Sequence, residues 1–202
     1  MNNILLTGGG GVLGTEFKKY ISCDAPTHKE FDITKFKKKQ DYKVVIHSAA
    51  YTDLIKAETD KQTCFKVNVH GTYNLVKAFQ NSYFIYISTE YVKNPVNFYS
   101  YTKLWGEEIV TRYAKNYLIV RTLFKPRPFP YEFAFYDQYT TGDYVDVICP
   151  MIVKEILKNR TGYVDLGTER KTILDLAKQT VPDIKSISVS DIKSVKLPKD
   201  YR

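Results

Sequence analysis

The chain has 202 residues, and 44% of them are hydrophobic, which is enough to fill one core or one large lobe beside a small one. Its net charge of +8 would suit nucleic acid or small anions such as nucleotides, but no zinc-finger spacing or aromatic RNA-binding signature is present, so we expect no nucleic-acid partner. No apolar run of about 18 residues or signal-like start occurs, so we expect no membrane partner and a cytoplasmic protein.

Cysteine usage agrees with that location. Cys23, Cys64 and Cys149 are odd in number and lie far apart. They are typical of reduced thiols and not of a disulfide framework or a zinc site, and we expect no metal.

Short apolar runs alternate with segments of helical period along the first part of the chain. We expect strands at 3–7, 43–49, 83–89 and 117–122, and helices at 11–21, 61–81 and 98–116. This alternation predicts parallel βαβ units, so the expected fold class is α/β, with a Rossmann-type doubly wound parallel sheet. The basic run at 35–39 is expected to be a solvated helix face.

The texture of the sequence changes after Arg121. The segment 124–144 contains several prolines and many aromatic residues, which predicts a loop or lid. A helix at 147–159, a short strand at 162–167 and a helix at 171–179 should follow, before an irregular end. We therefore expect a dinucleotide-binding core at 1–124 and a small, shortened substrate lobe at 125–202 that is interleaved with the core.

A glycine turn directly follows the first strand. Gly8, Gly11 and Gly14 fit the pattern T-G-x-x-G-x-x-G that starts at Thr7. Glycines there let backbone N–H groups approach a pyrophosphate, and the helix that begins at the turn adds the positive end of its dipole. The position between a first strand and a first helix predicts dinucleotide binding.

The wide glycine spacing resembles that of the extended branch of the short-chain dehydrogenase/reductase superfamily. The acidic residue expected some positions further on has two candidates, Glu30 and Asp32. Lys29 could pair with a 2′-phosphate, which favours NADPH, with NADH as the alternative.

A candidate catalytic group follows the third strand. The strand ends with the hydroxyls of Ser88 and Thr89, and Tyr99 and Lys103 come next, spaced to lie on one face of a helix. Reduction of a ketone needs an acid for the developing alkoxide, and a nearby ammonium should lower the pKa of a tyrosine towards working pH. A threonine hydroxyl can hold the carbonyl oxygen in line.

The same tyrosine–lysine spacing occurs a second time. Tyr73 and Lys77 also lie four residues apart, but no strand ending in hydroxyls precedes them. We therefore interpret Tyr73 as a packing residue, and Tyr101, which points away from the working face, in the same way.

Longer motifs are similar to those of the dTDP-4-dehydrorhamnose reductases. They are VVIHSAAYTDLIKAE, KVNVHGTYNL, ISTEYV, YSYTKLWGE, IVRTLF, DQYTTGDYVDVI and LGTERKTILDLAKQ, and together they cover most of the chain. The resemblance implies that Ser48, Ala49, Ala50 and Tyr51 line the cofactor, that Asn68 supports them and that Thr89 is catalytic. The complete set of expected cofactor contacts is Thr7, Gly8, Gly10, Gly11, Val12, Leu13, Gly14, Lys29, Asp32, Ile33, Ser48, Ala49, Ala50, Tyr51, Asn68, Tyr99, Lys103 and Thr122.

The resemblance also implies an activity: NAD(P)H-dependent reduction of a nucleotide-linked 4-keto-6-deoxy sugar, in deoxysugar and polysaccharide biosynthesis. Tyr99 would donate the proton, and Lys103 would tune it and bind the nicotinamide ribose. Lys125, Arg127 and Arg170 could meet the diphosphate of the nucleotide sugar. A homodimer is expected only by analogy with the superfamily.

Two departures from the family keep alternatives open. Relatives that also epimerise the sugar carry a cysteine two positions after the catalytic hydroxyl, where this chain has Tyr91, which weighs against such an epimerase. The short substrate lobe favours a non-catalytic NADP-binding regulatory subunit. An epimerase or dehydratase of the same fold remains the nearest rival, and the sequence leaves the nucleotide (dTDP, UDP or GDP) open.

Overall fold

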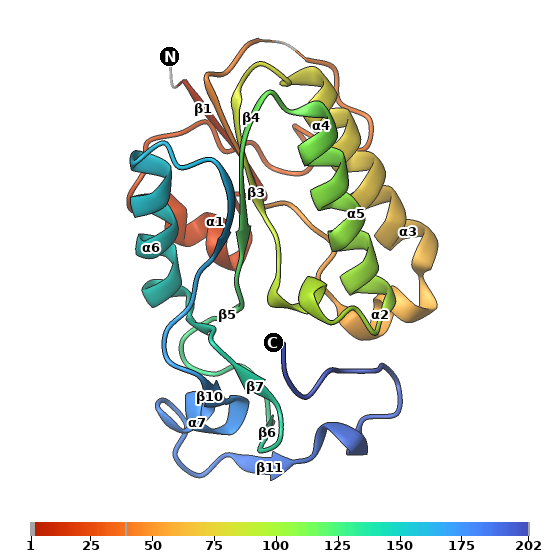
Figure 1. Cartoon of the computed structure of the whole chain (residues 1–202), viewed down its shortest axis with the longest axis vertical. Helices are drawn as coiled ribbons and strands as arrows, with labels where there is room; N and C mark the ends of the chain where they lie inside the picture. The colour runs from red at the N-terminus through yellow and green to blue at the C-terminus, as the bar shows by residue number, and fades with distance from the viewer. Residues whose placement is uncertain (1–2, 39, 202) are drawn as a thin grey trace.

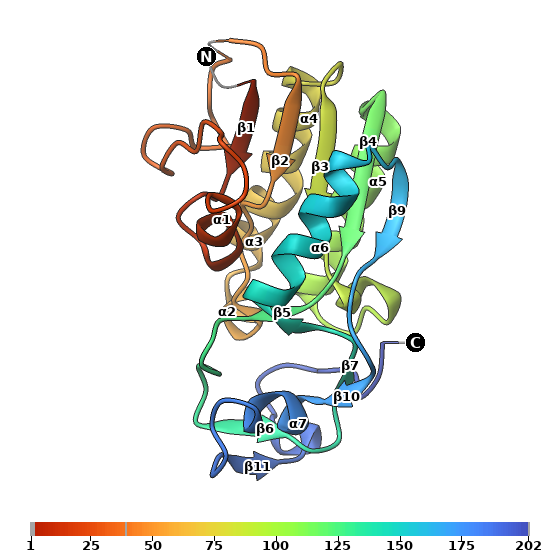
Figure 2. The same cartoon turned by 90° about the vertical axis from the view of Figure 1, so that its left-hand side faces the viewer.

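The computed structural model describes residues 3–38 and 40–201. A parallel five-stranded sheet lies between two layers of helices, and a smaller lobe sits below its carboxyl edge (Figures 1 and 2). In order across the sheet the strands are β1 (Ile4–Thr7), β2 (Val44–His47), β3 (Tyr83–Ile87), β4 (Asn116–Arg121) and β9 (Gly162–Asp165). The predicted α/β class and its parallel sheet are therefore confirmed.

Helices cover both faces of this sheet. One face carries α1 (Val12–Phe17) and α6 (Val145–Leu157); the other carries α3 (Lys61–Phe65), η1 (Lys66–Gly71), α4 (Thr72–Ala78) and α5 (Phe98–Tyr113) (Figure 1). Adjacent strand residues point to opposite faces, so Leu6 belongs to the core beneath α1 and α6, whereas Leu5 belongs to the core beneath α4 and α5. Both faces are buried, which explains the continuous apolar strands in the sequence.

The order in which successive strands are added to the sheet changes direction at β1. Leu5 makes a parallel bridge to Asp24 on one side, and β1 pairs with β2 on the other. The connections on the two sides of β1 therefore diverge, which leaves a crevice at the carboxyl end of this strand, where open α/β sheets bind their ligands.

The lobe is built from two separate segments. Between them, α6 and β9 return to the core, so the lobe interrupts the core sequence. Its elements are β5 (Phe124–Lys125), β6 (Phe133–Phe135), β7 (Tyr139–Thr140), β8 (Asp143–Tyr144), β10 (Lys171–Thr172), α7 (Ile173–Lys178), β11 (Lys185–Ile187) and η3 (Val189–Asp191). The end of the described chain returns between lobe and core (Figure 1).

Several expectations about single elements were wrong. The first helix ends at Phe17, and the expected helix at 61–81 is broken by the π-helical turn η1, where a Cβ on Gly71 would come within 2.7 Å of Ile33 Cδ1. The last part of the chain is not wholly irregular, because β11 pairs with β6. Three short helices, α2 (Leu54–Thr59), η2 (Glu90–Lys93) and η3, were not expected, and the segment 124–144, expected to be a loop or lid, contains the short strands β5 to β8.

The basic run is solvated but not helical. Lys35, Lys37 and Lys38 are exposed in a turn and the coil after it, and Lys39 lies outside the described residues. Asp32 accepts hydrogen bonds from the backbone N and the hydroxyl of Thr34, which gives the backbone an alternative to a helix. Within the described ranges, no helix combines the length and the apolar character needed to cross a bilayer.

Candidate active site

The glycine turn presses against the end of β2. Gly8 has φ of +74°, and a Cβ there would lie 2.6 Å from the backbone N of Ala49. A Cβ on Gly14 would lie 2.2 Å from the carbonyl oxygen of Gly8, whereas one on Gly10 would meet nothing within 4 Å. Only glycine therefore fits at Gly8 and Gly14, while Gly10 faces open space.

A buried hydrogen-bond chain fixes the strand end that precedes this turn. The Thr72 hydroxyl donates to the Asn68 carbonyl (2.7 Å), so it must accept from Nε2 of His47 (2.9 Å). Nδ1 of His47 then accepts from the Thr7 hydroxyl (2.9 Å), whose oxygen accepts from the backbone N of Ala49 (3.3 Å). Only the neutral imidazole with its proton on Nε2 satisfies every member of this chain.

Asn68 supports the cleft from behind. Its side-chain oxygen accepts from the backbone N of Tyr51 (2.7 Å), and its Nδ2 donates to the Tyr51 carbonyl (3.1 Å) and to the Thr102 hydroxyl (2.9 Å). Asn68 itself does not line the cleft, so the geometry suits the supporting position that the sequence suggested.

The crevice beside β1 is a cleft of about 820 Å³. The expected cofactor and catalytic residues that line it are Thr7, Gly8, Gly10, Gly11, Val12, Leu13, Asp32, Ile33, Ser48, Ala49, Ala50, Tyr51, Thr89, Tyr99, Lys103 and Thr122. Gly14, Lys29 and Asn68 do not line it. Lys18 and His28 line it although the sequence reading did not include them.

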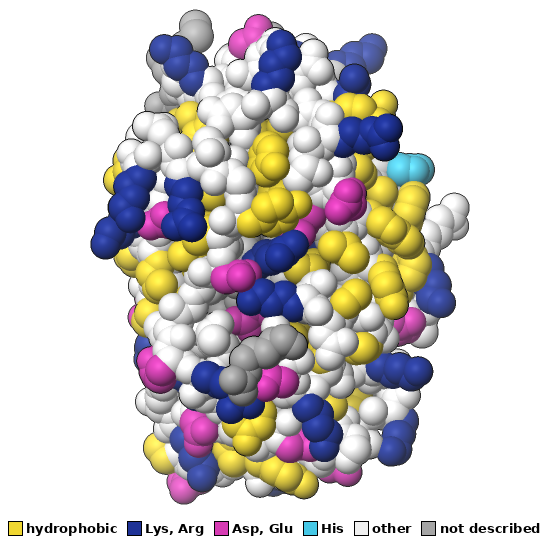
Figure 3. All heavy atoms as spheres, viewed as in Figure 1, with side chains coloured by type: hydrophobic (Ala, Val, Ile, Leu, Met, Phe, Trp, Pro, Cys, Tyr) yellow, Lys and Arg dark blue, Asp and Glu magenta, His cyan; other side chains and the backbone are white. Residues whose placement is uncertain are grey.

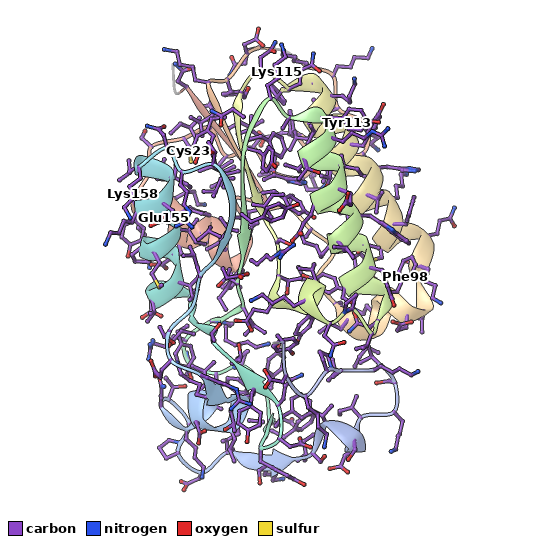
Figure 4. The ribbon with its side chains drawn as sticks, viewed as in Figure 1. Cys23, Phe98, Tyr113, Lys115, Glu155 and Lys158 are labelled. Carbon is purple, nitrogen blue, oxygen red and sulfur yellow. The ribbon has the colours of Figure 1, made fainter. Side chains whose placement is uncertain are left out.

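The catalytic candidates meet at the lobe-facing end of the cleft. Asn97 starts α5 with a capping box, so Tyr99 lies in the first turn of the helix, near the end that Phe98 marks in Figure 4. Tyr99 is 9% exposed and Lys103 3%. Thr89 lies just beyond β3, and its hydroxyl oxygen accepts from the backbone N of Tyr91 (3.3 Å), which leaves its proton as a donor towards Tyr99.

Burial dominates the electrostatics of this pair. It raises the pKa of Tyr99, the nearby Tyr91 adds to the rise, and a hydrogen bond from Thr89 opposes it. Among the effects of the chain's own groups, burial outweighs any effect of the lysine, and Tyr99 is held as a neutral phenol. Burial also lowers the pKa of Lys103 to about 7.

Lys103 is held by the neighbouring strand. Its Nζ donates to the Ile87 carbonyl (2.8 Å) and lies 4.1 Å from the centroid of the Tyr86 ring. The close approach of α5 to β3 depends on Gly106, where a Cβ would lie 2.1 Å from the Tyr86 hydroxyl oxygen. One helical turn beyond Lys103, Glu107 is buried and paired with Arg121 of β4 (2.6 Å).

The wall of the cleft contains a polar atom without a hydrogen-bond partner in the described part of the protein. Among the described residues, the Thr122 hydroxyl is buried at the cleft wall without a hydrogen-bond partner. Buried polar atoms are normally paired, so an orphan in a cleft indicates a bound group. Together with the glycine turn, whose backbone faces open space at Gly10, this fits a dinucleotide.

The acidic candidates at the adenosine end are both engaged locally. Glu30 accepts from the backbone N (2.9 Å) and the hydroxyl (2.8 Å) of Thr27, and Asp32 caps Thr34. Lys29 is exposed and outside the cleft wall, whereas Lys18 is exposed on that wall.

A second cavity, of about 450 Å³, adjoins the first. Tyr91, Leu54 and Lys125 line both. The second cavity is largely aromatic and aliphatic, with Phe129, Tyr131, Phe133, Phe135, Ile173, Ile192, Val195 and Leu197 in its wall.

The three basic residues expected to meet a diphosphate differ in position. Lys125 lies at the junction of the two cavities, with its Nζ 4.8 Å from the Tyr131 ring centroid. Arg127 is paired with Asp146 (3.0 Å), and Arg170 with Asp200 (2.8 Å). Neither arginine lines a cavity, so the structure brings only Lys125 to the expected place.

The second tyrosine–lysine pair lies elsewhere. Tyr73 is 40% exposed, its ring contacts Tyr113 edge-on at 5.4 Å, and Lys77 lies over that same Tyr113 ring. Tyr101 is also exposed, beside Trp105. None of these side chains lines the cleft, but Tyr73 and Tyr101 are surface residues and not the packing residues that we expected.

Sequence reasoning missed His47, Glu107 and Lys18. The first two are buried polar residues whose partners come from other strands and helices, and no spacing signal reveals such contacts. Lys18 could have been found by asking which cation directly follows the short first helix, about two turns from the glycine turn.

Known proteins of similar sequence include dTDP-4-dehydrorhamnose reductases and, at 29% identity, an inverting UDP-N-acetylglucosamine 4,6-dehydratase of Campylobacter jejuni. The family model described as RmlD substrate binding domain matches residues 1–125. The dTDP-4-dehydrorhamnose reductase of Mycolicibacterium smegmatis is 33% identical over an alignment of 147 residues that covers 59% of this chain and 44% of that protein. The chain spans about half the length of the curated relatives it matches.

Solved structures share the whole fold. The crystal structure of a dTDP-4-dehydrorhamnose reductase from Clostridium acetobutylicum superposes with a TM-score of 0.87 at 23% identity, covering 98% of this chain and 88% of that one. One from Bacillus anthracis, in complex with NADP, gives 0.86 at 23% identity with the same coverage. The family match extends over more than half of the chain, and the resemblance seen in the motifs is confirmed: the protein belongs to the RmlD substrate binding domain family of the short-chain dehydrogenase/reductase superfamily.

Proposed function

We propose that this protein reduces the 4-keto group of a nucleotide-diphosphate-linked 6-deoxy sugar, with NADPH as the preferred cofactor and NADH as the alternative. The observation that carries the proposal is that the glycine turn and the group of Thr89, Tyr99 and Lys103 open into one cleft. The relatives named dTDP-4-dehydrorhamnose reductase support the same reaction, and the role we propose for it is in deoxysugar and polysaccharide biosynthesis.

In this proposal, Tyr99, Thr89 and Lys103 each have a role that agrees with their surroundings in the cleft. A bound nicotinamide would supply the hydride to C4 of the sugar. Tyr99 donates the proton that the developing alkoxide needs, and the raised pKa keeps that proton on the phenol before reaction. The Thr89 hydroxyl donates a hydrogen bond to the same oxygen and holds it in line. Lys103 places a positive charge beside the phenol and binds the nicotinamide ribose.

The adenosine end of the cleft favours NADPH through Lys18. Glu30 and Asp32 already accept hydrogen bonds in local turns, which weighs against their use by both hydroxyls of an NADH ribose. Lys18, which has no ion-pair partner in the described part of the chain, is available for a 2′-phosphate.

The choice of cation can be tested by binding. Lys18→Ala should weaken NADPH binding about tenfold, roughly 1.4 kcal/mol, and leave NADH binding almost unchanged. Lys29→Ala is the matched control, because Lys29 lies outside the cleft wall. Titration of each variant with both cofactors, followed by cofactor fluorescence, measures the effect. A larger loss in Lys29→Ala would return the role to the residue expected from the sequence.

The second cavity would take the nucleotide part of the substrate. Lys125 lies between this cavity and the catalytic group, where a diphosphate would lie if the sugar were at Tyr99. The aromatic wall offers surfaces on which a base can stack. Tyr91, the residue in the place of the epimerase cysteine, lines both cavities and offers no thiol for abstraction of a proton from carbon.

A homodimer would use the helices opposite α6. Hydrophobic side chains gather along the right-hand edge of the molecule in Figure 3, and Tyr73, Tyr101 and Trp105 are the exposed large aromatics of α4 and α5. Burial of this surface would supply a favourable association energy.

The proposal is tested by supplying NADPH with dTDP-4-keto-6-deoxyhexose and its UDP and GDP counterparts, and following absorbance of the reduced cofactor. We expect turnover with one of them and formation of the 4-hydroxy sugar. Cofactor binding without turnover of any of these would contradict the reductase and favour the regulatory-subunit alternative.

A further inference from the structure

The carboxyl end of β3 is joined to α5 by two side chains one helical turn apart. Lys103 Nζ donates to the Ile87 carbonyl (2.8 Å), and the Glu107 carboxylate accepts from the Ser88 hydroxyl (2.5 Å). Ile87 and Ser88 are consecutive, and Thr89 comes next. These two contacts therefore fix the strand end that carries the catalytic threonine against the helix that carries the catalytic tyrosine.

Glu107 also has a partner on β4. Arg121 donates from Nε to both carboxylate oxygens (3.0 and 3.2 Å) and from Nη2 to Oε2 (2.6 Å). Glu107 is 1% exposed, whereas Arg121 reaches towards the surface over the ring of Tyr163 (4.7 Å). The carboxylate is therefore held in one place in the interior, where its field acts strongly on a neighbouring cation.

The groups around Lys103 give Glu107 a particular importance. Those that interact with it are Glu107 on α5, Cys64 on α3, Tyr86 on β3 and His47 on β2, and Tyr99 lies four residues before it on the same helix. Among these described neighbours, Glu107 is the one carboxylate; the others are neutral near pH 7. Burial lowers the pKa of Lys103 to about 7, and Glu107 acts against that fall.

We propose that Glu107 is a positioning residue whose carboxylate, fixed by Ser88 and Arg121, keeps Lys103 as an ammonium ion beside Tyr99. The role rests on the proposed reductase function, because it is there that Lys103 must be charged to bind the cofactor ribose and to act on the phenol. Without this carboxylate, a lysine buried as deeply as Lys103 would lose its proton at a lower pH.

The test is the pH dependence of cofactor binding. Glu107→Gln keeps the shape of the side chain and an acceptor for the Ser88 hydroxyl but removes the charge. Glu108→Gln, an exposed carboxylate on the same helix, is the matched control. NADPH affinity is measured by cofactor fluorescence from about pH 6 to about pH 9, a range that spans the lowered lysine pKa.

In the wild type, affinity should fall as pH rises and Lys103 loses its proton. In Glu107→Gln the midpoint of this fall should move to lower pH by about one unit, while Glu108→Gln should keep the wild-type midpoint. A Glu107 that only packs would weaken binding equally at every pH. An unmoved midpoint in Glu107→Gln, or a wild-type affinity that does not depend on pH, would overturn the inference.

A substitution of Arg121, the ion-pair partner of Glu107, tests the inference if Glu107→Gln does not fold. If Glu107→Gln shows no thermal unfolding transition, Arg121→Gln replaces it, with the opposite expectation: the carboxylate loses its cation, and the midpoint should rise. A midpoint that stays unmoved there also overturns the inference. Because binding is the readout, failure of sugar reduction in the wild type would contradict the proposed function alone.

Discussion

Single residues in this cleft act through the direction of their hydrogen bonds. His47 is 1% exposed and must accept from Thr7 while it donates to Thr72, so a second proton on the ring would break the chain that ends at Ala49. Burial lowers the pKa of His47 to about 3, from an ordinary value near 6.5. The neutral ring is thus part of the support of the glycine turn.

Because the pKa of His47 is lowered in the folded protein, we expect the free energy of unfolding to fall in acid. Between its unfolded and folded pKa values the unfolded chain binds the extra proton, so the free energy of unfolding falls as pH falls from about 6.5 towards 3. From about pH 7 to about pH 5 the His47 contribution should fall by about 2 kcal/mol. Urea unfolding at both values measures it.

The control for this prediction is another histidine. His47→Gln should be less stable than the wild type at neutral pH but should lose less on acidification, whereas His70→Gln, at an exposed position, should keep the wild-type dependence. Equal pH dependence in all three proteins would show that His47 titrates normally.

At the scale of elements, the turn between β1 and α1 is the most demanding piece of backbone. Gly8→Ala places a side chain at positive φ, which costs about 1–2 kcal/mol, and against the end of β2 as well. We expect this variant to lose NADPH affinity by at least about tenfold. Lys29→Ala, outside the cleft wall, should bind almost as the wild type does. Isothermal titration compares the two, and an unchanged affinity in Gly8→Ala would mean that the glycine turn is not the binding surface.

Elements and residues whose pattern is local in the sequence could be predicted, and those that depend on contacts between distant segments could not. The strands, the glycine turn and the Tyr99–Lys103 pair were predictable because their patterns are local in sequence. Gly71, at the end of the π-helical turn, packs against Ile33 from a distant part of the chain, and the Glu107–Arg121 pair joins α5 to β4, so neither contact is visible in the local sequence. Asp32 illustrates the reverse case: it is in the predicted region, but its carboxylate is used by Thr34.

At the scale of the whole molecule, the sheet and the lobe bring distant segments to one place. The glycine turn comes from the first residues, Tyr99 from the middle of the chain, and Lys125 from the lobe connection, yet all three line one cleft. The parallel sheet explains this convergence, because its strands end at one edge. The sequence order predicted that edge, but which lobe cation reaches it could not be predicted, since Arg127 and Arg170 are engaged by acids of other segments.

The two tyrosine–lysine pairs allow a direct test of the central claim, that Tyr99 is the acid of a sugar reduction. The rate of NADPH oxidation with the accepted nucleotide-linked 4-keto sugar is measured for the wild type, Tyr99→Phe and Tyr73→Phe. The account predicts a loss of about 10² to 10⁴ in kcat for Tyr99→Phe, with cofactor affinity retained, and no loss for Tyr73→Phe. Equal rates in the wild type and Tyr99→Phe would contradict it.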